Sequence, residues 1–252
     1  AAHRPLPTNM AARGIARVAA LALLYILCCA DGVVARTREE WAKRSIYQVL
    51  TDRFATTTAT NISAPECNTN DMKYCGGTWK GIQDNLDYIQ GMGFDAIWIS
   101  PVVKNTPDGY HGYWAKDLYS VNEQFGSAED LKALVQACHA RDIWVMVDVV
   151  ANHFGPQANG NDDFSQFTPF NKPEHYHPYC VISQQDWDSM NQYDIEHCRL
   201  ADLPDLDQEQ EFVRGALLKW VGWLVRSFAF DALRIDTVPE VSAGFWKEFV
   251  GA

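Results

Sequence analysis

Basic residues are scarce in this sequence. Its 252 residues include 21 Lys and Arg against 32 Asp and Glu, which gives a formal net charge of -11 at pH 7. Proteins that bind nucleic acid need a basic face for the phosphates, so nucleic acid is not expected as a partner. Internal repeats and low-complexity linkers are also absent. Because 47% of the residues are hydrophobic, the chain can bury a core, and disorder is not expected.

The apolar run near the N-terminus lacks the length of a membrane span. This run, at 18–29, is too short for a comfortable transmembrane helix. It follows Arg13 and Arg17 and precedes small residues at 33–35, a pattern typical of a secretory signal peptide. We therefore predict a leader and signal peptide at 1–35, a secreted extracellular protein, and no membrane attachment after cleavage.

Cysteine spacing of the zinc-binding type is absent as well, because no two cysteines are separated by two residues. Two of the seven cysteines fall in the predicted signal peptide. Exported chains form disulfides by default, and two pairs of cysteines flank short polar loops. The predicted disulfides are Cys67–Cys75 and Cys180–Cys198. Cys138 has helical spacing with apolar neighbours and is predicted to be a buried free thiol.

Apolar β-type runs alternate with amphipathic helical segments along the chain. The predicted strands are 46–54, 94–99, 143–150 and 230–235, and the predicted helices are 81–91, 127–141 and 211–228. Ser127 and Asp130 have the spacing of a capping box at the start of the second helix. Near-continuous apolar strands alternating with helices indicate an α/β fold with a parallel sheet covered on both faces.

One connection breaks this alternation. Residues 151–207 separate the third predicted strand from the next helix and are rich in Asn, Asp, Pro and aromatic residues. Loops of that length are usually functional or form small domains of their own. We predict an irregular excursion domain here, on the rim of a barrel.

Charged residues lie where the third and fourth predicted strands end. Asp148 interrupts one apolar strand, and Arg234 and Asp236 close the other. In (β/α) barrels the carboxyl ends of the strands form the active-site face. Alternate residues of a strand point the same way, so Arg234 can hold Asp236 ionised, as a carboxylate nucleophile requires. A structural ion pair explains these two residues equally well.

Four segments together resemble the sequence blocks of glycoside hydrolase family 13, the α-amylase family. They are 110–114 (Tyr-His-Gly-Tyr-Trp), 148–153 (Asp-Val-Val-Ala-Asn-His), 203–207 (Leu-Pro-Asp-Leu-Asp) and 233–236 (Leu-Arg-Ile-Asp). The fungal Taka-type members are the most similar, and the resemblance runs from about residue 41 to residue 249. It implies a (β/α)8 TIM barrel in which about the first four βα units are present.

The resemblance assigns roles to individual residues. Asp236 matches the catalytic nucleophile, and Arg234 matches the arginine beside it. His111, Tyr113, Trp114 and His153 match substrate contacts at the cleavage point. The same resemblance implies a Ca²⁺ site of hard oxygen ligands. Its ligands would be the side chains of Asn152, Glu196 and Asp205 and the backbone carbonyl of Glu240.

These assignments divide the chain into four parts. After the signal at 1–35, barrel strands 1–3 occupy 36–150, and the calcium-binding excursion domain occupies 151–207. Barrel helix 3 and strand 4 occupy 208–252. A retaining glycosidase needs a second carboxylate as acid/base, which this family carries on the strand after Asp236. We therefore expect the chain to be an N-terminal fragment that is inactive and poorly soluble alone, since its sheet edges are open.

The expected function is endo-hydrolysis of α-1,4-glucosidic bonds in starch or glycogen, with retention through a glycosyl-Asp236 ester. The partner would be an α-glucan polysaccharide, and the full-length protein is expected to be a monomer. Pro239 and Glu240 stand where the family has Lys-His, which leaves an α-glucanotransferase or an α-glucosidase open. A non-catalytic glucan-binding protein is the alternative from another class.

Overall fold

A computed structural model describes residues 36–57, 67–159 and 163–252. The predicted signal peptide at 1–35 lies outside the described residues. Within 36–252 the chain forms one compact unit. No helix in the described part of the chain is long and apolar enough to cross a membrane.

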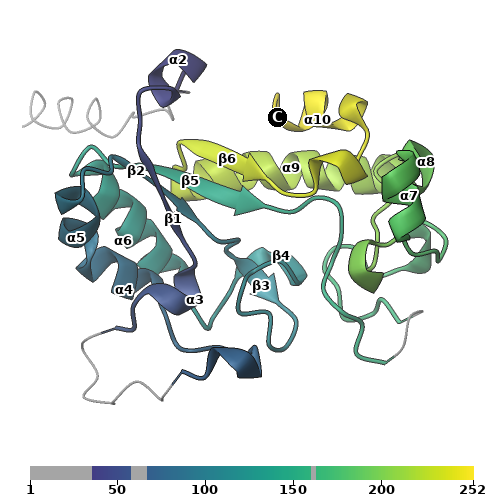
Figure 1. The fold of residues 1–252 in the computed structure, drawn as a ribbon, viewed down its shortest axis with the longest axis horizontal. Helices are drawn as coiled ribbons and strands as arrows, with labels where there is room; N and C mark the ends of the chain where they lie inside the picture. Colours follow the sequence, from purple (N-terminus) through teal and green to yellow (C-terminus); the bar gives the residue numbers. More distant parts are fainter. Residues whose placement is uncertain (1–35, 58–66, 160–162) are drawn as a thin grey trace, which may run out of the picture. The chain divides into compact units, whose positions relative to one another are not determined.

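A four-stranded parallel sheet forms the centre of this unit (Figure 1). Its strands are β1 (Ile46–Val49), β2 (Ala96–Ile99), β5 (Trp144–Val149) and β6 (Ala232–Ile235), in the order β1-β2-β5-β6. Neighbours in the sheet are therefore consecutive βα units, and all three pairings are parallel. The predicted α/β architecture with a parallel sheet is confirmed.

The two faces of the sheet are covered unequally. On one face Ile97, Ile99, Val145 and Val147 are fully buried in a core shared with the helices. On the other face Ile46 is 39% exposed, and Trp98 and Met146 are only partly buried. The prediction that both faces are covered is therefore wrong for the face that carries Trp98, because the described residues supply no helix layer there.

The helices follow the predicted order, and one predicted helix is divided in two. They include α4 (Trp79–Asp84), α5 (Leu86–Gly91), α6 (Ala128–His139), α9 (Glu211–Phe228) and α10 (Ala243–Phe249). Helix α9 matches the prediction, and Ser127 and Asp130 form the predicted capping box of α6. The predicted helix 81–91 is two short helices, because the Asn85 side chain donates to the Gly81 carbonyl at 2.8 Å and interrupts the ladder.

The predicted strand 46–54 is also shorter than expected. It ends at Val49, and Thr51–Phe54 forms the short helix α3. The buried carboxylate of Asp52 accepts hydrogen bonds from the backbone N–H groups of Cys75 and Gly76. This contact fixes a turn where the apolar pattern alone predicts an extended chain.

An antiparallel hairpin that the sequence did not predict projects beyond the sheet. It consists of β3 (Val103–Asn105) and β4 (Ala115–Val121) and carries a loop at 106–114. Its two strands pair with register shifts, so the alternation of polar and apolar residues is broken. The hairpin matters because its loop contains three of the predicted substrate contacts.

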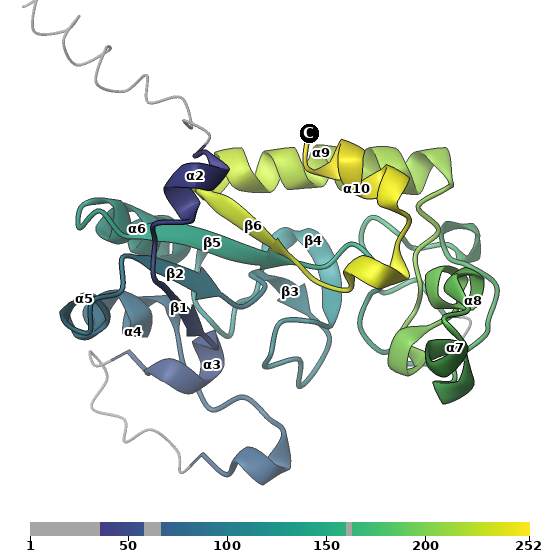
Figure 2. The ribbon, with the colours of Figure 1, turned by 45° about the horizontal axis from the view of Figure 1, so that its top comes forward.

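The predicted excursion, 151–207, contains the short helices α7 (Gln184–Ser189) and α8 (Gln192–His197). These helices lie beyond the carboxyl-terminal ends of β5 and β6 (Figure 2). Both predicted disulfides are present, Cys67–Cys75 and Cys180–Cys198, and Cys138 is a buried free thiol as predicted. The second disulfide closes the loop that carries α7 and α8.

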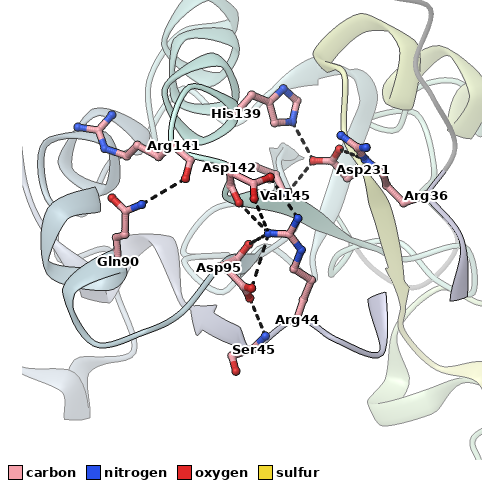
Figure 3. Close-up of polar contacts among 10 residues, drawn as sticks. All are labelled: Arg36, Arg44, Ser45, Gln90, Asp95, His139, Arg141, Asp142, Val145 and Asp231. Atoms are coloured by element: carbon pink, nitrogen blue, oxygen red, sulfur yellow. Dashed lines mark hydrogen bonds and ion pairs between the residues drawn. The ribbon is translucent and has the colours of Figure 1, made fainter. Parts of the chain in front are cut away.

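The amino-terminal ends of the strands are held by a network of ion pairs (Figure 3). The Arg44 guanidinium donates to the Asp142 carbonyl at 2.9 Å and lies 3.9 Å from the ring of Trp144. The Asp231 carboxylate, 7% exposed, accepts from the Val145 backbone N–H and contacts His139 Nε2, both at 2.8 Å. These contacts join α6, β5 and the start of β6 at the end of the sheet opposite the predicted active site.

Replacing Asp231 with Ala should lower the free energy of unfolding of the full chain by about 1–3 kcal/mol, because a buried backbone N–H loses its acceptor. Urea denaturation measures this change. Asp87→Ala is the matched control, since that carboxylate is 89% exposed and pairs with Arg141 at the surface. Equal stability losses in the two variants would contradict the structural role of Asp231.

Candidate active site

The carboxyl-terminal ends of β5 and β6 bring a charged cluster together. Asp148 and Arg234 are direct neighbours in the parallel register, so their side chains leave the same face of the sheet. Arg234 Nη1 lies 3.1 Å from Asp148 Oδ1 and 2.5 Å from Asp236 Oδ1. One guanidinium therefore links two carboxylates, of which the sequence predicted only Asp236 as a site residue.

Asp148 is the buried centre of this cluster. Its side chain is 0% exposed and accepts hydrogen bonds from Tyr113 Oη at 2.8 Å and from Trp98 Nε1 at 2.9 Å. Burial raises the pKa of Asp148 to about 6, against the opposing effect of its hydrogen bonds from Tyr113 and Arg234. The carboxylate is therefore ionised at neutral pH and fixes the positions of Arg234 and Tyr113.

Asp236 is the more accessible carboxylate. Its side chain is 18% exposed, against 0% for Asp148. Its backbone N–H donates to the Val149 carbonyl at 3.0 Å, which extends the β5–β6 ladder to this residue. A carboxylate held by one arginine and open to solvent can attack an electrophilic carbon, whereas a buried and fully bonded one cannot.

Three predicted substrate contacts lie on the hairpin loop. His111 and Tyr113 are stacked with ring centroids 5.7 Å apart, and Trp114 meets His111 edge-on at 4.9 Å. The loop turns at Gly112, whose φ of +89° and closeness to Pro101 leave no room for a side chain. Because Tyr113 also bonds to Asp148, this aromatic surface is attached to the charged cluster.

The two predicted site histidines are neutral at physiological pH. His153 is 3% exposed, and burial lowers its pKa to about 4, with Asp236 opposing the shift. Burial also lowers the pKa of His111, and the charge of Arg53 adds to the effect. Neutral imidazoles can donate hydrogen bonds to sugar hydroxyls without neutralising Asp236.

A group of oxygen atoms lies behind His153. Residues 152–154 and 204–206 pair as short extended segments, with Leu206 N donating to Asn152 O at 2.8 Å. The Asn152 amide oxygen faces Asp205 Oδ1 at 3.2 Å and the Glu240 carbonyl at 3.0 Å. Three oxygen atoms that face one another need either a reversed amide, which would donate to both partners, or a cation between them.

Calcium fits this oxygen group. At Ca–O distances of 2.3–2.6 Å, neighbouring ligand oxygens lie about 3 Å apart, the spacing found here. Asn152 and Asp205 are 0% and 2% exposed, so the polar atoms are shielded from water. Among the described residues, no group of three or more His, Cys, Asp and Glu side chains could hold a metal ion. The oxygen group described here is of another kind, because it contains one carboxylate oxygen, one amide oxygen and one backbone carbonyl.

The fourth predicted ligand does not join this oxygen group. Glu196 lies on α8, and its Oε1 accepts from Gln192 Nε2 at 2.7 Å. The same Gln192 amide donates to the Pro239 carbonyl at 2.9 Å, next to Glu240. Glu196 is therefore connected to the residue before Glu240 through Gln192, and the structure shows no direct contact of its carboxylate with Asn152 or Asp205.

Comparison with known families decides the classification. The family model described as the alpha-amylase catalytic domain matches residues 48–248. The chain belongs to the alpha-amylase family. This confirms the family resemblance seen in the sequence and assigns the four-stranded parallel sheet to the (β/α)8 class.

Individual alpha-amylase family members agree. An alpha-amylase of Saccharomycopsis fibuligera is 44% identical over 253 residues, covering 94% of this chain and 50% of that protein. The alpha-amylase structure from Malbranchea cinnamomea has a TM-score of 0.76 and 44% identity, covering 85% of this chain and 46% of that chain. A cyclomaltodextrin glucanotransferase structure has a TM-score of 0.69 and 29% identity, covering 82% of this chain and 47% of that chain. The chain thus spans about half the length of the relatives it matches.

Proposed function

We propose that the protein containing this chain is a retaining glycosidase that hydrolyses internal α-1,4 bonds of starch-type glucans. The observation that carries this proposal is the link from Arg234 to both Asp148 and Asp236, with Asp236 partly exposed near an aromatic loop. Aromatic rings next to carboxylates suit sugars, which present apolar ring faces and polar hydroxyls. The related proteins named alpha-amylases support the same substrate class.

In the proposed reaction, Asp236 attacks the anomeric carbon as the bond to the leaving oxygen breaks. This forms a glycosyl ester, and water then attacks the same carbon, so that configuration is retained. Arg234 holds the Asp236 carboxylate through a contact of 2.5 Å, and Asp148 holds Arg234 in place. Tyr113 and Trp114 would contact the sugar at the cleavage point, while His111 and His153 would donate to its hydroxyls.

The leaving oxygen must receive a proton from another group. Asp148 is unsuited to this role, because its side chain is 0% exposed and already accepts bonds from Tyr113, Trp98 and Arg234. We assign the acid to the Glu that this family carries on the strand after β6. Residues 36–252 alone are then proposed to be inactive, since general acid catalysis is typically worth about 10²–10⁴-fold.

Product analysis on maltoheptaose tests this function in the protein that contains the chain. Shorter maltooligosaccharides whose new reducing ends are first released as α-anomers, as seen by NMR, are the expected products. First release of β-anomers would contradict the retaining mechanism, and an unchanged substrate would contradict hydrolysis.

A glucanotransferase is the second candidate. Pro239 and Glu240 occupy the positions where the family resemblance places Lys-His on the leaving-group side. The likeness to a cyclomaltodextrin glucanotransferase structure supports this second candidate. Products longer than maltoheptaose, or cyclic products, would identify transfer to a sugar acceptor in place of water.

The proposed metal is one structural Ca²⁺. Asn152, Asp205 and the Glu240 carbonyl would hold it, with Glu196 as a proposed further ligand that would have to move toward them. Its chemistry would be to neutralise the facing oxygens and to join three chain segments, the end of β5, the 204–206 segment and the residues after β6.

Removal of calcium by EDTA should lower the melting temperature of the full-length protein that contains this chain. A cation present at 100 times its Kd stabilises the folded state by about 2.7 kcal/mol, which corresponds to a fall of roughly 5–10 °C. Differential scanning calorimetry with and without EDTA measures the change, and magnesium is the control cation. The same melting temperature in calcium and in EDTA would exclude a structural calcium ion.

The remaining proposals concern the whole protein. We propose secretion after removal of 1–35, which the two disulfides support. We also propose that 36–150 and 208–252 belong to one barrel, that 151–207 is its excursion domain, and that the full-length protein is a monomer. The barrel would be completed by strands that cover the exposed face around Ile46 and Trp98.

A further inference from the structure

We propose that His177 is the positioning residue that orients the Asp205 carboxylate for the cation, an inference that rests on the proposed calcium site. His177 Nδ1 lies 2.7 Å from Asp205 Oδ2, and the His177 backbone N–H donates to the Asp205 carbonyl at 3.0 Å. The side chains are 8% and 2% exposed, so water does not compete for this contact. His177 was not among the residues predicted from the sequence.

The two carboxylate oxygens of Asp205 have different partners: Oδ2 contacts His177, and Oδ1 faces Asn152. An ionised carboxylate only accepts hydrogen bonds, so Nδ1 carries the proton and donates to Oδ2. Oδ1 is then the oxygen that faces the Asn152 amide oxygen at 3.2 Å. Without a donor on Oδ2, the carboxylate could rotate about its terminal torsion, which has a broad preference, and withdraw Oδ1 from the cation.

The imidazole is itself held in place. Its ring lies 4.8 Å from that of His197, and His197 stacks on Tyr193 at 4.3 Å. The Cys180–Cys198 disulfide joins the segment after His177 to the residue after His197. The second ring nitrogen, Nε2, lies 3.6 Å from Asp207 Oδ1, which is too long for a hydrogen bond. The hydrogen bond from Nδ1 to Asp205 therefore fixes the orientation of the His177 ring.

Two substitutions of similar size distinguish the hydrogen bond that His177 donates to Asp205 from the packing of the His177 ring. His177→Asn places an amide N–H close to where Nδ1 lies, whereas His177→Gln places it near Nε2, away from Asp205. Partners of metal ligands typically contribute about 10–100-fold to metal affinity. We expect the Gln variant to bind calcium about 10–100-fold more weakly than the native chain and the Asn variant to stay within about 3-fold of it.

The experiment is isothermal titration of calcium into the metal-stripped full-length protein that contains this chain, with the melting temperature in EDTA as a second readout. His139→Leu is the matched control, because it removes another His–Asp contact, 2.8 Å from Asp231, at the opposite end of the sheet. It should lower the melting temperature in EDTA and in calcium alike while leaving the calcium Kd unchanged.

Equal calcium affinity in the native chain and the Gln variant would overturn the inference while leaving the calcium site intact. A native chain that binds no calcium would overturn both the calcium site and the role of His177. If the Gln variant does not fold, the Asn variant decides: a loss of 10-fold or more in a folded Asn variant would show that Nδ1 donation is not what His177 supplies.

Discussion

Replacing Asp236 with Asn in the protein that contains this chain should lower turnover on starch by on the order of 10⁴-fold or more. An amide is a poor nucleophile and cannot form the glycosyl ester. The fold should remain intact, because Asn has nearly the same shape and the side chain is 18% exposed. Initial rates of reducing-end release, measured beside the unfolding curve, give both quantities.

Asp188→Asn is the control for this experiment. Asp188 lies on α7, is exposed, and pairs with Gln184 at 2.9 Å, outside the charged cluster. Its substitution should change neither rate nor stability. Turnover of the Asp236→Asn variant within 10-fold of the native rate would remove Asp236 from the role of nucleophile.

Replacing Asp148 with Asn should lower the free energy of unfolding of the protein that contains this chain by about 3 kcal/mol, because it removes a buried charge that accepts hydrogen bonds from three side chains. Asp148 accepts hydrogen bonds from Arg234, Tyr113 and Trp98. The amide of Asn would direct an N–H toward these donors, where no acceptor is present. Urea denaturation monitored by tryptophan fluorescence measures the loss. The expected effect exceeds that at Asp231, whose replacement leaves one backbone N–H, that of Val145, without its acceptor.

Tyr113→Phe provides the comparison for Asp148. It removes one hydrogen bond to the same carboxylate and should cost only about 1 kcal/mol. A loss in the Asp148 variant no larger than in Tyr113→Phe would show that the cluster tolerates the loss of the Asp148 charge. The account of Asp148 as the buried centre of the site would then be wrong.

The regular elements could be predicted where side-chain burial alone decides them. Helix α9 has apolar residues at helical spacing along its whole length, and the predicted bounds are those observed. Strand β1 was predicted too long because Asp52 turns the chain through contacts with Cys75 and Gly76, which are distant in the sequence. The β3–β4 hairpin was missed because its pairing is irregular and its strands are partly polar.

The contact between Arg234 and Asp236 could be predicted for a different reason. Residues 234 and 236 differ by two along a strand, so geometry requires Arg234 and Asp236 to point the same way. Asp148 was visible as a single charge in an apolar strand, yet its bonds to Tyr113 and Trp98 depend on the hairpin loop and on β2. The role of His177 depends on the pairing of 152–154 with 204–206, which no local pattern indicates.

The family resemblance, not residue spacing, gave the predicted calcium ligands. The structure brings Asn152, Asp205 and the Glu240 carbonyl together, because 152–154 pairs with 204–206 beside the residues that follow β6. Glu196 is connected through Gln192 and stays a prediction as a ligand. A backbone carbonyl carries no sequence signal, since any residue type can supply it.

The central claim, that Asp236 is the nucleophile of a retaining glycosidase, is tested most directly by trapping its ester. A fluorinated maltosyl fluoride suits this purpose, because fluoride leaves without protonation and the ring fluorine slows hydrolysis of the ester. After trypsin digestion and mass spectrometry, the account predicts a glycosyl label on Asp236 within the peptide 235–247. A label on another carboxylate, or no label on a protein that hydrolyses starch, would contradict it.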